Sequence, residues 1–208
     1  MSAEIQLPII LMAALIGAAS PGPATLGIAG VSMTSGRGPG VAMALGVVTG
    51  SLMWSFSAAL GLGAIMLANA WMFEVIRYIG VCYLMYLAYN SAKAAVSNSE
   101  TAIPALANKT LSGAYRRGLF LHLTNPKAIL FFGSLYSIGV PPGTPLSGVM
   151  VVFLSVGALS ATIFVGYGVL FSSAAFARAY SRLHRLFNSV FALAFGSAGV
   201  KILFTRFA

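Results

Sequence analysis

The sequence predicts an all-α membrane protein with six transmembrane helices in two inverted three-helix repeats, the first helix of each repeat being broken by proline. Three observations support this prediction. Hydrophobic residues make up 59% of the 208 residues and charged residues only 7%, whereas roughly 25% of the residues in soluble domains are charged. Charged and turn-forming residues divide the chain into six apolar segments long enough to cross a bilayer. Each half of the chain also begins with an apolar segment that contains proline in its interior.

The predicted spans cover residues 5–31, 40–68, 72–92, 116–139, 146–175 and 186–204. The first span follows Glu4 rather than a basic flank, so we interpret it as a retained helix and not as a signal peptide. The second and fifth spans exceed the ~20 residues that a bilayer requires, and we expect them to tilt. We expect one transmembrane domain with half one at 1–95, a cytoplasmic loop at 96–115 and half two at 116–208.

The basic residues indicate how the spans are oriented. Eight lie in the first, third and fifth loops: Arg37, Lys93, Lys109, Arg116, Arg117, Arg178, Arg182 and Arg185. Three lie on the opposite side of the membrane: Arg77, Lys201 and Arg206. Because basic loops stay in the cytoplasm, both termini are expected to be periplasmic. The net charge of +9 is therefore interpreted as a sign of membrane orientation, and no nucleic-acid partner is expected.

The scarcity of acidic residues excludes several kinds of chemistry. The chain has no Asp, and its only acidic residues are Glu4, Glu74 and Glu100. It has no GxxxxGK[ST] phosphate-binding loop, so any transport must draw on a gradient rather than on a Walker-type ATPase. Cys82 is the only cysteine and cannot form an intramolecular disulfide. No His, Cys and Asp cluster has metal-ligand spacing, and we expect neither a metal nor a cofactor.

Two proline-containing breaks predict the functional site. The first lies at Ser20, Pro21, Gly22 and Pro23, and the second at Thr124, Asn125, Pro126 and Lys127. Proline removes a backbone donor, and in hydrocarbon the groups it frees survive only against protein or a wet cavity. Broken helices at matching positions of inverted halves are typical of transporter binding sites, so we expect both breaks to face one cavity. The alternative is a plain proline kink in each helix.

Lys127 strengthens the prediction of a site at the second break. It lies ten residues after Arg117, about 15 Å along a helix and therefore near the middle of the bilayer. An ionisable residue at that depth is costly, which favours a functional role. The alternatives are that the Lys127 side chain snorkels to the membrane surface, or that the fourth span begins later in the chain than predicted. His122 is predicted either to share the cavity or to satisfy a neighbouring group. Gly46 and Gly50, spaced four apart, predict a close helix contact within or between subunits.

Several segments together resemble the RhtB/LysE family of amino-acid exporters, in family order and over nearly the whole chain. They are SPGPATL from Ser20, GVVTGSLMW from Gly46, IGVCYLMYLAYNSAK, YRRGLFLHLTNPKAILFFGS and LHRLFNSVFALAFGSAGVKI. NPKAILFFGSLYS and TGSLMW are most similar to the threonine-exporter branch. Ala24 follows PGP where many relatives carry Asp or Asn, so the resemblance does not identify the amino acid.

The resemblance implies a secondary exporter of small amino acids, similar to threonine or homoserine, or of their derivatives. It implies that the protein works in the bacterial inner membrane, is driven by the proton-motive force and is not an enzyme. The expected partners are a small-molecule substrate and the lipid bilayer, and a homo-oligomer is an open possibility. Two other functions remain open: a channel or carrier for another small metabolite or ion, and an intramembrane hydrolase based on Thr124 and Lys127.

Overall fold

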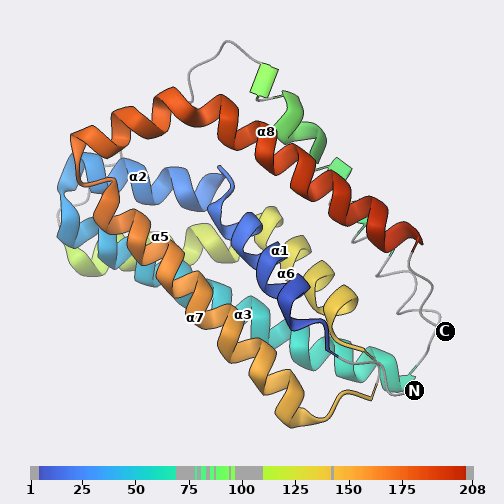
Figure 1. Cartoon of the computed structure of the whole chain (residues 1–208). Coiled ribbons are helices and arrows are strands. Elements are labelled where there is room, and N and C mark those ends of the chain that lie inside the picture. The colour runs from blue at the N-terminus through green and yellow to red at the C-terminus, as the bar shows by residue number, and fades with distance from the viewer. Residues whose placement is uncertain are drawn as a thin grey trace.

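The described residues fold as a bundle of helices and contain no strand (Figure 1). The computed structural model describes residues 5–68, 78, 81–82, 85–86, 88–93, 95–96, 110–141 and 143–204. The helices with defined bounds are α1 (Leu7–Ala19), α2 (Pro23–Ser35), α3 (Arg37–Ala68), α5 (Leu111–Leu123), α6 (Pro126–Gly139), α7 (Leu146–Leu170) and α8 (Ala174–Phe204). The all-helical class predicted from the sequence is confirmed for this part of the chain.

Two or three membrane spans are supported by the length and composition of the described helices. Arg37–Gly61 of α3 and Leu146–Leu170 of α7 are each long and apolar enough to cross a bilayer, and the pair formed by α1 and α2, bent by 50°, passes as a third span. The predicted span at 72–92 falls largely outside the described residues, as do Glu4, Glu74 and Glu100. The described residues thus support two or three of the six predicted spans.

Both predicted breaks are confirmed, and proline has a different position from the one expected. Pro23 and Pro126 occupy the first turn of α2 and α6, where the N–H that proline lacks has no helical acceptor in any case. The prolines therefore begin the second helix of each pair instead of interrupting a continuous one. Asn125 caps α6 by accepting a hydrogen bond of 3.0 Å from the Lys127 amide, which satisfies one of the first free donors of that helix.

Several helix boundaries differ from the prediction: α2 ends at Ser35, α3 begins at Arg37, which was expected in a loop, and α7 ends at Leu170. Helix α5 begins at Leu111, capped by Thr110, whose hydroxyl accepts a 3.1 Å bond from the Gly113 amide; residues 111–115 therefore belong to this helix and not to the expected loop. Helix α8 begins at Ala174 rather than near residue 186. Arg178 and Arg182 accordingly lie exposed on a helix instead of in a loop.

Close contacts fix the relative directions of the helices around the centre of the bundle. Met43 and Gly50 of α3 lie against Gly118 and His122 of α5 respectively, so α3 and α5 run parallel. A Cβ built on Gly46 would lie 2.0 Å from the Tyr115 carbonyl oxygen, which confirms the close helix contact predicted at this glycine and places it within the chain. Such small-residue contacts let two helix backbones approach closely in a membrane.

The α1–α2 pair runs opposite to the α5–α6 pair. Ile10 of α1 lies against Gly139 at the end of α6, whereas Gly17 lies against Phe131 nearer its beginning. Helix α7 likewise runs opposite to α3, because Gly168 at its end contacts Gly40 at the beginning of α3. The two broken helix pairs are therefore antiparallel, and their breaks lie at the same level of the bundle.

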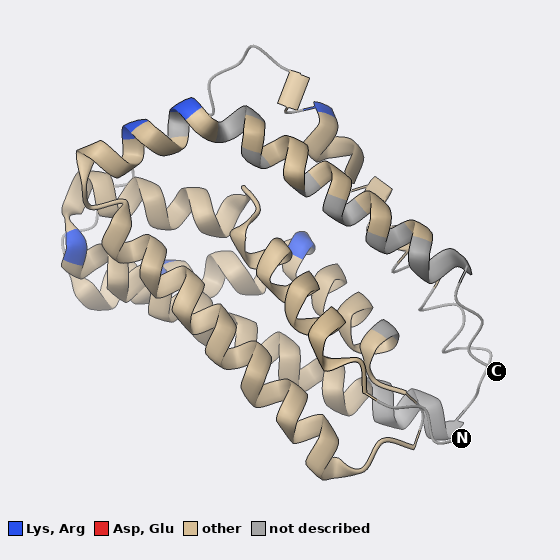
Figure 2. Ribbon diagram, viewed as in Figure 1, with Lys and Arg blue, Asp and Glu red and all other residues tan. Residues whose placement is uncertain are grey.

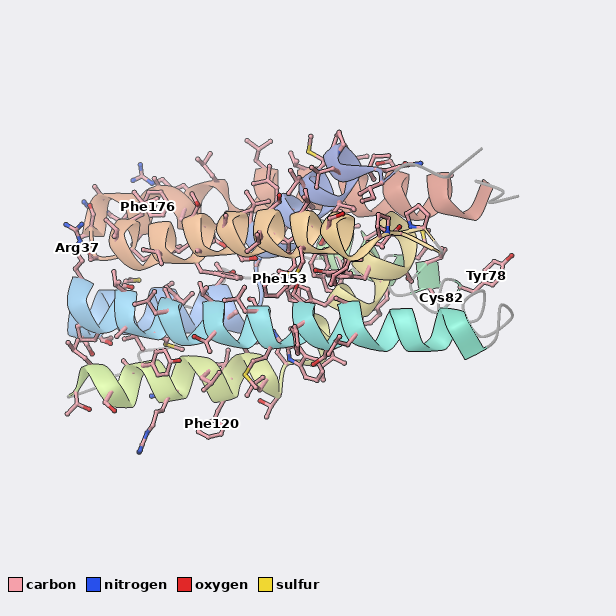
Figure 3. The ribbon with its side chains drawn as sticks, turned by 90° about the horizontal axis from the view of Figure 1, so that it is seen from below. Arg37, Tyr78, Cys82, Phe120, Phe153 and Phe176 are labelled. Carbon is pink, nitrogen blue, oxygen red and sulfur yellow. The ribbon has the colours of Figure 1, made fainter. Side chains whose placement is uncertain are left out.

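The outside of the bundle is apolar and the inside contains polar groups. Phe120 (63% exposed), Leu154 (61%) and Leu60 (60%) lie on the outer surface, and Figure 3 shows Phe120 projecting outward from α5. Ser51 and Asn125 are among the polar side chains that are buried inside. This distribution suits a lipid environment, where polar groups are directed toward the interior of the bundle.

Candidate functional site

The two helix breaks meet at one cavity inside the bundle. Its volume is about 40 Å³, enough for about three water molecules. Ser20, Gly22 and Thr25 line it from the first break, and His122, Asn125 and Lys127 line it from the second. Ser51 of α3 and Ser160 of α7 complete the polar part of the wall, and Phe131, Phe132 and Phe164 form much of the apolar part.

Lys127 joins the second break to the first. Its Nζ lies 3.4 Å from the Ser20 carbonyl oxygen and 3.5 Å from the Pro21 carbonyl oxygen, and it donates to the Ser20 hydroxyl. Gly22 leaves room for this approach, because a Cβ built there would lie 3.3 Å from Nζ. Among the described residues that line the cavity, Lys127 is the only Lys, Arg, Asp or Glu.

Figure 2 shows how unusual this position is for a basic residue. The basic positions at the beginnings of α3 and α8 gather at one end of the bundle, whereas Lys127 lines the internal cavity. Arg37 marks the basic end in Figure 3, and Tyr78 lies at the opposite end. A charged group in the middle of an apolar bundle requires polar compensation, which the carbonyls of the first break provide for Lys127.

Specific donors satisfy the carbonyls that the first break frees. In a continuous helix the Gly17 and Ala19 carbonyls would accept from residues 21 and 23, which are both proline. Instead, Gly17 accepts a 3.0 Å bond from the Ser20 hydroxyl, and Ala19 accepts a 3.0 Å bond from the Tyr167 hydroxyl of α7. An unsatisfied carbonyl in hydrocarbon costs several kcal/mol, so these two hydroxyls stabilise the break.

Tyr167→Phe should therefore destabilise the protein by about 1–3 kcal/mol, because it leaves the Ala19 carbonyl without its donor. The measurement is thermal unfolding of the purified protein in detergent. Tyr89→Phe is the matched control, since Tyr89 is 66% exposed and its hydroxyl should contribute little. Equal melting temperatures for Tyr167→Phe and the wild type would contradict the assigned role of this hydroxyl.

His122 connects the cavity to α3. Its Nε2 shares a 3.0 Å hydrogen bond with the Ser51 hydroxyl, and its ring packs edge-to-face on Phe164 at 5.9 Å. The side chain is only 5% exposed. Within the described part of the chain, His122 Nδ1 is a buried atom with no hydrogen-bond partner. Both alternatives considered for His122 therefore hold: it lines the cavity, and it satisfies a neighbouring serine.

The cavity gathers most, but not all, of the residues singled out in the two breaks. Ser20, Gly22, His122, Asn125 and Lys127 line it, and Pro21 contributes its carbonyl to Lys127. Pro23 is exposed and does not line the cavity, and the side chain of Pro126 lies outside the part of the chain that the structure describes.

Thr124 is also exposed and does not line the cavity. Its hydroxyl donates a 2.8 Å bond to the Phe120 carbonyl one turn back in α5. Sequence reasoning missed Thr25, Ser51 and Ser160 as lining residues. Ser51 directly follows Gly50 on the α3 face that contacts α5 closely. Its position next to this glycine is the feature of the sequence from which a role for Ser51 in the cavity could have been predicted.

The electrostatics of the cavity suit a small zwitterion. The C-terminal end of α1 carries partial negative charge on its carbonyls, and the N-terminal end of α2 carries partial positive charge on its first amides. Ser20, at the end of α1, and Ala24, in the first turn of α2, both line the cavity. Among the described residues, no group of three His, Cys, Asp or Glu side chains could hold a metal ion.

A bundle of apolar helices with a polar cavity at two helix breaks defines a membrane protein that handles a small polar solute. Residues 15–206 match the family model described as LysE type translocator, so the chain belongs to that family. The resemblance seen in the sequence is thereby confirmed. The protein thus belongs to a family of membrane translocators, which are transporters and not enzymes.

The chain is similar to curated relatives over almost its full length. It is 26% identical to the threonine efflux protein of Escherichia coli (strain K12) over 199 residues. This aligned stretch covers 95% of this chain and 97% of the relative. The chain is 25% identical, with the same coverage, to the threonine efflux protein of Salmonella typhimurium. No solved structure gives a significant match to the chain.

Proposed function

We propose that this protein exports small zwitterionic amino acids similar to threonine and homoserine, or their derivatives, across the bacterial inner membrane. The observation that carries the proposal is the meeting of both helix breaks at one cavity with Lys127 between them. The family and the threonine efflux relatives support amino acids as the class of substrate. The proton-motive force is the proposed source of energy, because the chain has no phosphate-binding loop for ATP.

In the proposed binding mode the carboxylate of the substrate lies at Lys127 and at the first amides of α2. The amides of Ala24 and Thr25 belong to the first turn of α2, where no helical carbonyl is within reach. A carboxylate there receives charge-assisted hydrogen bonds and faces the positive end of the helix dipole. His122 Nδ1 is available for a side-chain hydroxyl of the substrate, since a site that hydrogen-bonds a hydroxyl discriminates against analogues that lack it.

Transport requires this cavity to change size, since its volume of about 40 Å³ holds about three waters and threonine or homoserine has more than twice that number of heavy atoms. The proposed architecture is two inverted repeats of three spans, with α1–α2 and α5–α6 as equivalent broken helices. Their antiparallel directions support this architecture. Rocking of one repeat against the other would open the cavity to each side in turn.

The test is efflux of radiolabelled amino acids from cells or proteoliposomes that contain the protein. We expect saturable export of L-threonine and L-homoserine against a concentration gradient, abolished by a protonophore. Flux that rises linearly with concentration and never runs against the gradient would indicate a channel. Absence of amino-acid flux through correctly inserted protein would reject the proposal.

The proposed orientation makes a separate prediction. A reporter fused after Ala208 should lie in the periplasm, and one inserted within residues 97–108 should lie in the cytoplasm, because eight basic residues flank one side and three the other. Alkaline phosphatase and green fluorescent protein fusions at both positions measure this, since each is active on one side of the membrane. A cytoplasmic C-terminus would contradict the model of six spans.

A further inference from the structure

The ammonium of Lys127 occupies the place of two missing backbone donors. In a continuous helix the carbonyls of Ser20 and Pro21 would accept from the amides of Ala24 and Thr25, four residues later. The break separates these pairs, and Lys127 Nζ lies 3.4 and 3.5 Å from the two carbonyl oxygens instead. The Ser20 carbonyl also accepts a 3.3 Å bond from the Thr25 hydroxyl, and Lys127 adds a donor from the other half of the chain.

Three oxygens converge on this ammonium. The third is the Ser20 hydroxyl, whose own hydrogen is directed to the Gly17 carbonyl at 3.0 Å, so its lone pairs are free to accept from Lys127. Ser20 is only 3% exposed, and its backbone ends α1, where the helix dipole favours a cation. The acceptors are held by the helix and not by Lys127, so another ammonium group could take the same place.

We propose that the Ser20 and Pro21 carbonyls and the Ser20 hydroxyl form a subsite for a primary ammonium group, which Lys127 fills in this conformation. Resting on the proposed function, the α-ammonium of the exported amino acid displaces Lys127 from this subsite. The released Lys127 then pairs with the carboxylate of the same substrate. A zwitterion brings no net charge, so the exchange leaves the total charge of the cavity unchanged.

Repulsion makes the exchange obligatory. Two ammonium groups cannot share these oxygens, because unit charges about 4 Å apart repel by about 4 kcal/mol at an effective dielectric constant of 20. No Asp or Glu lies among the described lining residues to neutralise a second cation. The substrate carboxylate therefore has to pair with the displaced Lys127 ammonium before the substrate ammonium can occupy the subsite. A simple amine without a carboxylate should not displace Lys127 from the wild-type protein.

The experiment fills the subsite with simple amines after Lys127 is shortened. Lys127→Ala removes the side chain from Cγ to Nζ, and n-propylammonium supplies the same atoms. Thermal unfolding in detergent is measured against n-propylammonium chloride, with sodium chloride at equal ionic strength. We expect a saturable rise in melting temperature, roughly 3–6 °C at ten times the dissociation constant, in the variant and none in the wild type.

Two matched measurements make the result specific. Lys127→Met keeps a stem of similar length and lacks the terminal ammonium, so ammonium chloride should stabilise it and n-propylammonium should not; it also provides the test if Lys127→Ala does not fold. Tetramethylammonium, which has no N–H donor, should stabilise neither variant. Absence of stabilisation by the matched amine, or equal stabilisation by tetramethylammonium, would overturn the subsite.

This readout is independent of transport. If the matched amines stabilise the variants but no amino acid is exported, the ammonium subsite stands and the proposed function fails. If amino acids are exported but the amines have no effect, the proposed function stands and the subsite is wrong.

Discussion

Lys127→Met should reduce amino-acid export by about 100-fold or more while the protein still inserts into the membrane. The change removes the ammonium through which Lys127, at the second break, contacts the Ser20 and Pro21 carbonyls of the first, and leaves a side chain of similar bulk. In the proposed mode it leaves the substrate carboxylate without its cationic partner in a buried cavity, a loss of about 3–5 kcal/mol. Each 1.4 kcal/mol is a factor of ten in affinity.

The measurement is the initial rate of export, normalised to membrane-inserted protein. Lys93→Met is the matched control, because Lys93 is exposed and does not line the cavity, and its export rate should remain near that of the wild type. Lys127→Arg should restore export only in part, since a guanidinium is planar and larger than an ammonium. Normal export by Lys127→Met would eliminate the cavity as the transport site.

The second large effect is expected where α3 crosses α5. A Cβ at Gly46 would lie 2.0 Å from the Tyr115 carbonyl oxygen, and a Cβ at Gly118 would lie 2.1 Å from the Met43 carbonyl oxygen. Both clashes are with backbone, which cannot turn aside as a flexible side chain can. Gly46→Ala or Gly118→Ala should therefore force the helices apart and cost about 3 kcal/mol, or roughly 10 °C in melting temperature.

Gly166→Ala is the matched control for this prediction. Gly166 lies inside α7, and no atom lies within 4 Å of a Cβ built on it. Alanine is the better helix former by about 1 kcal/mol, so this variant should be as stable as the wild type or slightly more stable. Thermal unfolding in detergent measures all three variants together. An unchanged melting temperature for both Gly46→Ala and Gly118→Ala would show that the helices do not cross this closely.

The same crossing positions part of the cavity. Gly50 lies one turn from Gly46, and a Cβ on it would lie 3.0 Å from His122 Cβ. The neighbouring Ser51 consequently reaches His122 Nε2. Separation of α3 from α5 should lengthen this contact, so the glycine variants are expected to lose export as well as stability.

The sequence by itself determined the features that depend on local chemistry. Apolar segments and the near absence of charge predict membrane helices, because burying charged groups in lipid is costly. Pro23 and Pro126 determine where the helices break, since a residue before proline avoids the helical conformation. The spacing of Gly46 and Gly50 indicated a close helix contact, because only small residues allow backbones to approach.

The tertiary structure decided which of these residues meet. Lys127 and Ser20 are 107 residues apart, and Tyr167 and Ala19 are 148 apart. The sequence predicted that the two breaks face one cavity, but it did not predict that Lys127 bonds Ser20, and it gave no sign of the contact between Tyr167 and Ala19. Thr124 and Asn125 are adjacent, yet the first is exposed and the second lines the cavity. A single turn between two helices sets these side-chain directions, and its geometry depends on how α5 and α6 pack against the rest of the bundle.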